Sequence, residues 1–325
     1  MLDMSLEELK RYQGCTPRAD DFDVYWKRAL AELEETPADD VWQESDFQVP
    51  NAICYDVFYT GVKGARIHAQ VVVPSQVKKE YPALIQFHGY RGNCGQWITK
   101  LPYVAAGFIV AALDCRGQGG ISEDIGGVKG NTMRGHIIRG LDGDVDNMLM
   151  RNIFLDTVQL ARILFAMPSV DENKVGAFGV SQGGALAIAL AALEPRIAKI
   201  STQYPFLSDY KRYLDMDLAK EASEELSDYF RLYDPLHERE KEIFERLSYI
   251  DIQNLASRIK GEVQFALTLM DNICPPSTQF AVYNKISTIK ETQIFQNFGH
   301  EDLPGQEDRR LQFFIRDWIQ VKATE

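Results

Sequence analysis

The sequence predicts an α/β fold in which a mostly parallel sheet is covered by helices on both faces. Short, mostly apolar runs recur along the chain, and stretches with helical periodicity lie between or after them. Apolar runs without alternation are typical of strands buried on both faces, which occur in parallel sheets between helical layers. The runs are Ala83–Phe87, Phe108–Leu113, Val175–Phe178, Val263–Leu269 and Gln293–Phe295, and the helical stretches include Asn152–Ala166, Ala185–Leu193 and Arg309–Val321.

Two further regions depart from this alternation. Before the first run, the pattern is helical from Leu6 to about Leu33, and it then alternates between Phe47 and Val73 as antiparallel strands do. Ser208 to Lys260 is charged, helical in pattern and free of strand-like runs. We expect a single domain over residues 1–325, with an N-terminal extension over 1–74 and a helical insertion over 208–260. The insertion is either a solvated helix pair or a cap over a site.

Composition excludes several classes of function. The 325 residues are 45% hydrophobic and 25% charged, as in soluble globular proteins, and the net charge is −12. An acidic chain repels phosphate backbones and anionic headgroups, which disfavours nucleic-acid and membrane partners. The longest apolar run has nine residues, about half of a membrane span, and the first residues do not resemble a signal peptide. Five scattered cysteines without a CxxC pattern favour a reducing cytoplasm: Cys15, Cys54, Cys94, Cys115 and Cys274.

A candidate nucleophile lies between a predicted strand and a predicted helix. Residues 179–183 read Gly-Val-Ser-Gln-Gly, which has the form G-x-S-x-G. Ser181 would sit on a strained turn, where side chains at 179 or 183 would collide with neighbouring backbone. The helix that follows adds positive potential and unpaired N–H groups beside the hydroxyl. This context predicts a nucleophilic serine on an α/β-hydrolase fold.

A serine nucleophile needs a general base and an acid that orients the base, and in this fold they follow in the order Ser, Asp or Glu, His. His237 and His300 are the histidines after Ser181. His237 lies in the charged segment, where we expect an exposed helical residue, whereas His300 comes directly after the last predicted strand. We therefore predict His300 as the base. Asp271 ends the strand Val263–Leu269, at the strand end where ligands bind, and we predict it as the orienting acid.

We expect neither a metal nor a cofactor. The pair His300-Glu301 invites comparison with the zinc motif H-E-x-x-H, but the fifth position is Pro304, which cannot ligate a metal and would break the helix.

The loop after the strand Ala83–Phe87 reads His88-Gly89-Tyr90, where this fold supplies one oxyanion donor. The second donor comes from the residue after the nucleophile. We therefore predict the backbone N–H groups of Tyr90 and Gln182 as the oxyanion hole, and we expect His88 to brace the loop.

Three features together resemble carbohydrate esterase family 7, the acetyl xylan esterases and cephalosporin C deacetylases. They are Arg116-Gly117-Gln118, the extended nucleophile motif from Gly179 to Gly184, and His300-Glu301. The resemblance covers nearly the whole chain, including Asp21-Phe22-x-x-Tyr25-Trp26, Pro205-Phe206-Leu207 and Met270-Asp271-x-x-Cys274-Pro275-Pro276-Ser277-Thr278.

The resemblance implies the same roles for Ser181, His300, Asp271, Tyr90 and Gln182, and a bracing role for Arg116 and Gln118. It also implies a cytoplasmic homohexamer that removes acetyl groups from small esters, such as acetylated xylo-oligosaccharides and cephalosporin C, through an acetyl-enzyme. Two alternatives remain open: another serine hydrolase of this fold, such as a peptidase or thioesterase, and a non-catalytic binding protein.

Overall fold

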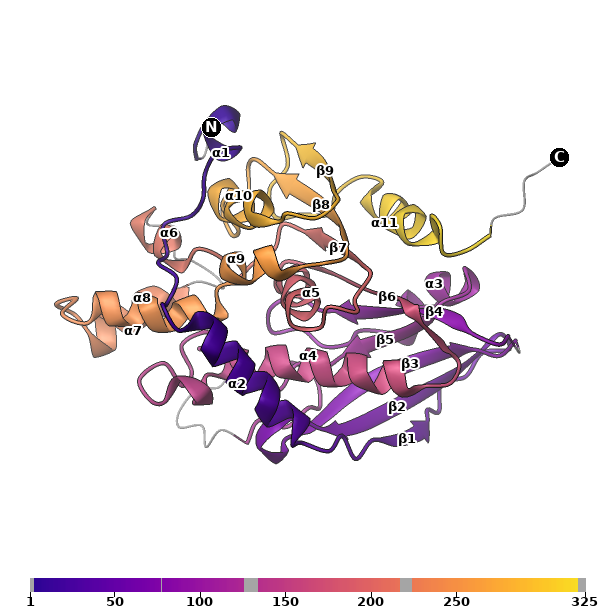
Figure 1. Ribbon diagram of the computed structural model, residues 1–325. Helices are drawn as coiled ribbons and strands as arrows, with labels where there is room; N and C mark the ends of the chain where they lie inside the picture. The colour runs from indigo at the N-terminus through magenta and orange to yellow at the C-terminus, as the bar shows by residue number, and fades with distance from the viewer. Residues whose placement is uncertain (1–2, 77, 126–133, 217–223, 321–325) are drawn as a thin grey trace.

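The computed structural model describes residues 3–76, 78–125, 134–216 and 224–320. Within these residues, nine strands form one sheet in the order β1-β2-β3-β5-β4-β6-β7-β8-β9 (Figure 1). The strands are β1 (Val41–Glu44), β2 (Ala52–Thr60), β3 (Arg66–Pro74), β4 (Tyr81–Phe87), β5 (Ile109–Leu113), β6 (Val170–Val180), β7 (Lys199–Gln203), β8 (Glu262–Thr268) and β9 (Lys290–Phe295). β1, β2 and β3 pair antiparallel with one another, and β3 also pairs antiparallel with β5. The strands β4 to β9 are parallel to one another.

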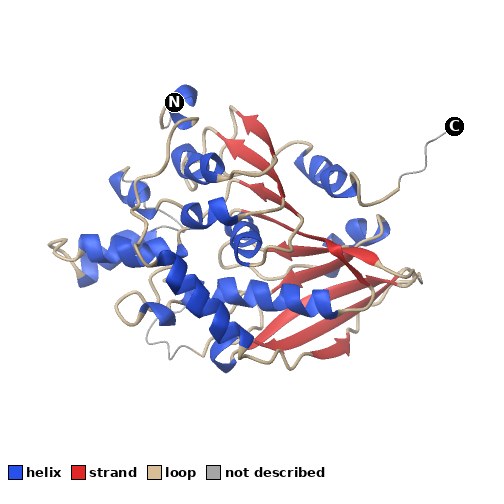
Figure 2. Ribbon diagram, in the orientation of Figure 1, coloured by secondary structure: helices blue, strands red, loops and turns tan. Residues whose placement is uncertain are grey.

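Helices cover both faces of the sheet, as the sequence predicts (Figure 2). One face carries α2, α4, α5, α9 and α10, and the other carries α3 and α11. Alternate residues of a strand enter opposite layers: Ala83 and Ile85 of β4 pack with the first group, and Leu84 packs with the second. The helices are α1 (Leu6–Leu9), α2 (Phe22–Glu34), α3 (Leu101–Ala105), α4 (Leu149–Ala166), α5 (Gln182–Leu193), α6 (Tyr210–Asp215), α7 (Glu224–Tyr233), α8 (Glu240–Leu247), α9 (Ile252–Leu255), α10 (Pro276–Lys285) and α11 (Gln306–Ile315).

The architecture is that of the α/β-hydrolase fold, as the sequence predicts. The bounds of some helices differ from the sequence-based prediction. The N-terminal helical stretch is two helices, α1 and α2, joined by an irregular segment. The last helix ends at Ile315, and Val321 of the expected range lies outside the described residues. The described residues of the segment 208–260 contain the helices α6 to α9 and no strand. Among the residues described, we find no helix whose length and hydropathy would let it span a bilayer.

Strand β7 is missing from the sequence-based prediction although it lies inside the sheet, between β6 and β8. Its five residues, Lys-Ile-Ser-Thr-Gln, are all buried, yet only Ile200 is apolar. Three of its polar side chains, those of Lys199, Ser201 and Gln203, have hydrogen-bond partners inside the protein, as when Ser201 Oγ donates to Gln264 Oε1 at 2.8 Å. An apolar run cannot reveal a strand of this kind.

Candidate active site

Ser181 stands on the turn between β6 and α5 with φ 58° and ψ −120°, a conformation that L-residues rarely adopt. Two glycines make this turn possible. A Cβ on Gly179 would lie 2.3 Å from the carbonyl carbon of Gly183, and a Cβ on Gly183 would lie 2.2 Å from the carbonyl oxygen of Phe87. Side chains at these positions would therefore push the first turn of α5 away from the ends of β4 and β6. The local geometry is the strained strand–turn–helix that the motif predicts.

Asp271 and His300 lie in the loops that follow β8 and β9, and their side chains meet. His300 Nδ1 lies 2.9 Å from Asp271 Oδ2, and the Asp271 carboxylate is fully buried. The other oxygen, Oδ1, accepts the backbone N–H groups of Ile273 and Cys274, each at 2.8 Å. Because the carboxylate accepts the Nδ1 hydrogen, the Nε2 atom of the neutral ring keeps its lone pair. The ring of Tyr204 packs against the imidazole with centroids 4.5 Å apart.

Cys274 connects this pair with Ser181. A carboxylate oxygen of Asp271, the Cys274 sulfur and a ring nitrogen of His300 all lie within 4.8 Å of one another. The Ser181 side chain lies beside the Cys274 thiol, whose pKa burial raises well above its usual value. The structure thus brings the three predicted residues to one site around a buried thiol. Cys274 belongs to the motif that carries the family resemblance, but nothing in the sequence alone indicates its contact with Ser181.

His237 lies elsewhere, and its surroundings differ from the sequence-based expectation. It is exposed as expected, but it occupies the turn between α7 and α8 with φ 55° rather than a helix. Its Nδ1 lies 2.8 Å from Glu240 Oε2, and its ring stacks on Phe230 with centroids 4.4 Å apart. These contacts account for the residue without a role in catalysis.

Gln118 links Gln182, one of the two predicted oxyanion donors, to the residue that follows the other, Tyr90. Gln182 is the first residue of α5, so its N–H is among the donors that a helix leaves unpaired in its first turn. Its side-chain amide pairs reciprocally with that of Gln118 at 2.9 and 3.0 Å. Gln118 Oε1 also accepts the N–H of Arg91 at 2.8 Å, and Arg91 has φ 61°. One amide therefore fixes both Gln182 and the oxyanion loop, residues 88–92, which contains Tyr90.

His88 and Arg116 occupy bracing positions. His88 Nδ1 lies 2.8 Å from the Gly89 carbonyl, which can only accept, and Nε2 accepts the N–H of Cys115 at 3.1 Å. Burial lowers the pKa of His88, which favours this neutral form. Arg116 forms a two-pronged ion pair with Asp156 of α4 at 2.6 and 2.7 Å, and both side chains are almost fully buried.

Among the residues that the structure describes, two clusters have residue types that ligate metals: His68, Cys94 and Asp114, and Asp271, Cys274 and His300. In each, a ring Nδ1 is already hydrogen-bonded to a carboxylate, at 2.7 and 2.9 Å respectively. Burial raises the pKa of both thiols, whereas metals bind the thiolate. These contacts favour hydrogen-bonded networks over metal sites.

His68 lies between two carboxylates. Its Nδ1 contacts Asp114 Oδ2 at 2.7 Å and its Nε2 contacts Asp56 Oδ1 at 2.9 Å, so both ring nitrogens face acceptors. Burial lowers the pKa of His68, but the hydrogen bonds with Asp114 and Asp56 outweigh it, and the pKa is raised overall. The imidazolium form, with two N–H donors, matches this arrangement.

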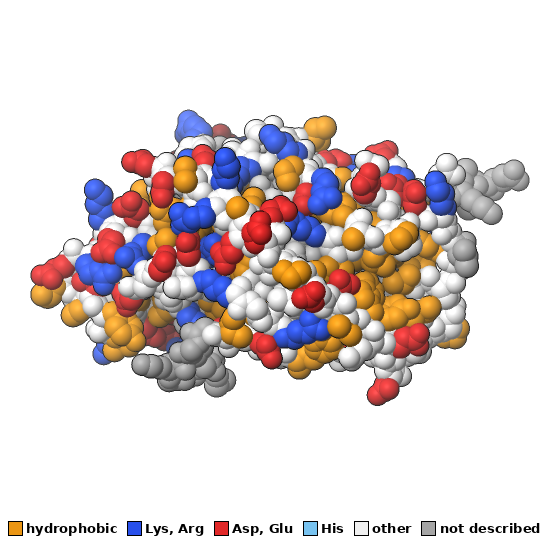
Figure 3. Space-filling view, turned by 60° about the horizontal axis from the view of Figure 1, so that its bottom comes forward, with side chains coloured by type: hydrophobic (Ala, Val, Ile, Leu, Met, Phe, Trp, Pro, Cys, Tyr) orange, Lys and Arg blue, Asp and Glu red, His pale blue; other side chains and the backbone are white. Residues whose placement is uncertain are grey.

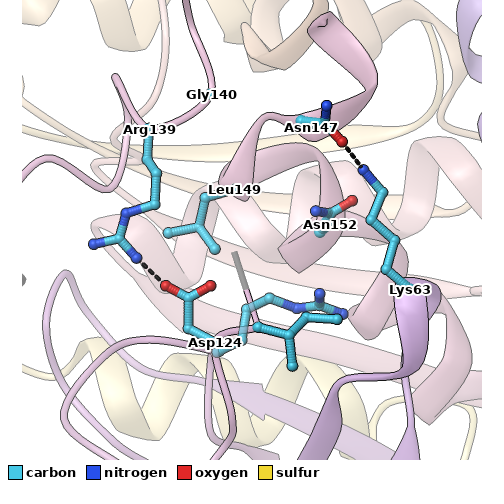
Figure 4. A pocket seen from close by; sticks show the side chains of 9 residues that line it. Lys63, Asp124, Arg139, Gly140, Asn147, Leu149 and Asn152 are labelled. Carbon is cyan, nitrogen blue, oxygen red and sulfur yellow. Dashed lines mark hydrogen bonds and ion pairs between the residues drawn. The ribbon is translucent and has the colours of Figure 1, made fainter. Parts of the chain in front are cut away.

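A cavity of about 530 Å³ opens beside Arg116, and Ser181 is not among its lining residues. Figure 4 shows Lys63, Asp124, Arg139 and Asn147 in its wall. Its basic side chains all have acceptors. The Lys63 amine donates to the Asn147 side chain, Arg139 pairs with Asp124, and Arg116 pairs with its partner on α4. Because these cations are already neutralised or hydrogen-bonded, the cavity does not present the open positive charge that an anionic ligand needs.

Comparisons with known proteins identify the family. The family model described as acetyl xylan esterase (AXE1) matches residues 1–317. Acetyl esterase Axe7A of Xylanibacter ruminicola is 30% identical in an alignment of 301 residues that covers 89% of this chain and 64% of that protein. The chain therefore spans less than two thirds of that curated relative.

Two solved structures are similar over almost their full length. Acetyl xylan esterase 1 from Thermoanaerobacterium sp. is 56% identical, with a TM-score of 0.94 over 97% of this chain and 99% of the other. The acetyl xylan esterase from Paenibacillus sp. R4 is 32% identical, with a TM-score of 0.91 over 96% of this chain and 99% of the other. The family match over residues 1–317 and the similarity to these structures show the same thing: this chain belongs to the acetyl xylan esterase family of carboxylic ester hydrolases.

Proposed function

We propose that this protein is a serine esterase that removes acetyl groups from small O-acetylated substrates through an acetyl-enzyme on Ser181. The observation that carries the proposal is the contact network at the strained turn. Ser181 reaches the Cys274 thiol, and that thiol lies within 4.8 Å of the hydrogen-bonded Asp271–His300 pair. A binding protein would require none of this arrangement.

The reaction follows from the roles of these side chains. His300 takes the Ser181 proton as the oxygen bonds to the acetyl carbon, and Asp271 stabilises the imidazolium that forms. The N–H groups of Tyr90 and Gln182 bind the oxyanion. The carbon–oxygen bond to the sugar then breaks, and His300 returns the proton to the departing alcohol. Water, deprotonated by His300, releases acetate and restores Ser181.

The proposed substrates are acetylated xylo-oligosaccharides and cephalosporin C. Support comes from the family resemblance and from the two similar structures, which are both acetyl xylan esterases. This chemistry requires only side chains and backbone groups of this chain, and we propose that no cofactor or metal takes part.

We also propose a cytoplasmic homohexamer, as the family resemblance implies. All five cysteines are free, which is in keeping with a reducing compartment. An apolar hollow between β1, β2 and the end of α4 offers a surface for subunit contacts, with Trp42, Tyr55, Ile163 and Met167 in its lining. In Figure 3, hydrophobic side chains gather on the side of the molecule where these elements lie in Figure 1. Light scattering coupled to gel filtration would measure the number of subunits.

The proposed activity is tested by measuring acetate release from p-nitrophenyl acetate, peracetylated xylobiose and cephalosporin C. Ser181→Ala removes the nucleophile, and Ser201→Ala, at a buried serine of the neighbouring strand β7, is the matched control. We expect activity in the wild type and the control and none above background in Ser181→Ala. Wild-type inactivity on all three esters would refute the proposal and favour a peptidase, a thioesterase or a binding protein.

A further inference from the structure

Glu225, on α7 of the helical insertion, is a buried carboxylate that the proposed reaction does not use. Only 4% of the residue is exposed. Its Oε2 accepts the backbone N–H groups of Ile137 and Ile138 at 2.8 and 3.1 Å, and its Oε1 accepts the hydroxyl of Tyr90. A single carboxylate therefore joins the insertion, the segment from 134 to 148 and the oxyanion loop.

The Tyr90 side chain is held on further sides. Its ring makes edge-to-face contacts with His136, with centroids 5.2 Å apart, and with Phe206, with centroids 5.8 Å apart. His136 Nδ1 lies 3.1 Å from the Tyr90 oxygen, and His136 Nε2 lies 2.8 Å from the carbonyl oxygen of Gly117. Gln118 fixes the loop from within, through the N–H of the residue after Tyr90. The backbone N–H proposed to bind the oxyanion thus belongs to a residue anchored on both sides.

The hydrogens in this network can be counted. The Gly117 carbonyl only accepts, so His136 Nε2 carries a hydrogen. The Tyr90 hydroxyl has one hydrogen and two acceptors in reach, the Glu225 carboxylate and His136 Nδ1. When Glu225 is ionised and His136 is neutral, the Tyr90 hydrogen can serve only one of these two contacts, and the other contact has no hydrogen. One added proton completes the network, either on Glu225, which then donates to Tyr90, or on His136 Nδ1, which does the same from the other side.

We propose that Glu225 is a positioning residue for the deacetylation reaction. Glu225 shares one proton with His136 through the Tyr90 hydroxyl and thereby fixes the oxyanion loop. The inference rests on the proposed esterase function and deepens it. In this arrangement the insertion holds the oxyanion loop in place through Tyr90. A misplacement of a catalytic donor by about 1 Å can cost about 100-fold in rate.

The titration of Glu225 agrees with this arrangement. Burial raises the pKa of Glu225 to about 7, against the hydrogen bonds from Tyr90 and the two backbone N–H groups, which lower it. Among the described residues, the other titratable groups that face it are His136 and Arg139 from the segment after residue 134 and Tyr210 from α6. The shared proton is therefore lost as the pH rises through neutrality.

Three variants separate positioning from packing. Glu225→Ala and Tyr90→Phe each break the network, and we expect kcat on p-nitrophenyl acetate to fall about 10- to 100-fold with KM within about twofold. Glu225→Gln reproduces the protonated network, because its carbonyl accepts the two backbone N–H groups while its NH2 donates to Tyr90. We expect this variant to keep kcat within about threefold of the wild type at pH 6. The ratio of its kcat to that of the wild type should rise as the pH passes about 7.

Tyr229→Phe is the matched control. It removes another hydroxyl contact between α7 and the same segment, from Tyr229 to Asp142 Oδ1 at 2.5 Å, without touching Tyr90. We expect wild-type kcat from this control, and circular dichroism melting reports whether each variant is folded. Any of four results would overturn the inference. Glu225→Ala could keep the wild-type kcat, or it could lose no more kcat than Tyr229→Phe or than Glu225→Gln. The fourth result is a ratio of Glu225→Gln kcat to wild-type kcat that stays flat with pH. An inactive wild type would instead refute the proposed function itself.

Discussion

Replacing Asp156 with alanine would leave Arg116 as an unpaired buried cation. The two side chains are 0% and 1% exposed, and their paired hydrogen bonds measure 2.6 and 2.7 Å. Removing one partner of such a pair costs about 3 to 5 kcal/mol, because the remaining charge keeps its desolvation penalty without its counter-ion. Since 1.4 kcal/mol is a factor of about ten, the unfolding equilibrium should shift by more than about 100-fold. Urea denaturation followed by circular dichroism would measure this shift.

The double variant Arg116→Met with Asp156→Leu separates charge burial from packing. Apolar replacement of both partners is often neutral or stabilising, so we expect it to recover most of the lost stability. The folded single variant should keep kcat within about threefold, because Arg116 braces the loop after β5 against α4 without touching the reacting atoms. A single-variant cost below about 1 kcal/mol, or a double variant as unstable as the single one, would refute this reasoning. A 100-fold loss of kcat in the folded single variant would contradict the bracing role.

Three further perturbations test the site and its support. Asp271→Asn should lower kcat on p-nitrophenyl acetate by about 10⁴-fold without unfolding the protein. The reason is that the amide can donate to His300 Nδ1 and so favours the wrong tautomer of the ring. A loss below about tenfold would contradict the orienting role. Gln118→Leu should lower kcat about 10- to 100-fold at similar KM, because the oxyanion loop and Gln182 lose their shared amide; unchanged kcat would argue against this link. The two carboxylates beside His68 raise its pKa in the folded protein. The protonated side chain therefore contributes its full stabilisation below the pKa of the unfolded chain, about 6.5, and this contribution is lost as the pH rises through the pKa of the folded protein. The difference in unfolding free energy between wild type and His68→Gln should therefore shrink from pH 6 towards pH 9, and a difference that grows would show that the sign is wrong.

Much of the fold could be predicted because buried parallel strands leave apolar runs in the sequence. The exceptions have physical causes. Strand β7 is polar and is buried through side-chain hydrogen bonds, so hydropathy does not reveal it. The N-terminal helical pattern continues across residues 10–21, yet the chain there bends away into irregular structure between α1 and α2.

The candidate site divides in the same way. Ser181 could be predicted because glycines at fixed spacing have a steric cause, and His300 and Asp271 because strand ends meet at one edge of the sheet. Contacts between distant segments leave no such pattern. Glu225 lies in a charged helical stretch that resembles any solvated surface, and only the fold brings its carboxylate to the Tyr90 hydroxyl.

The acetyl-enzyme itself provides the most direct test of the proposed mechanism. Rapid mixing with p-nitrophenyl acetate followed by acid quenching and peptide mass spectrometry would locate a covalently bound acetyl group. Our account predicts one acetyl group per active site on the peptide that contains Ser181, formed before steady-state turnover and absent from Ser181→Ala. Acetylation of another residue, or ester hydrolysis that persists in Ser181→Ala, would contradict it.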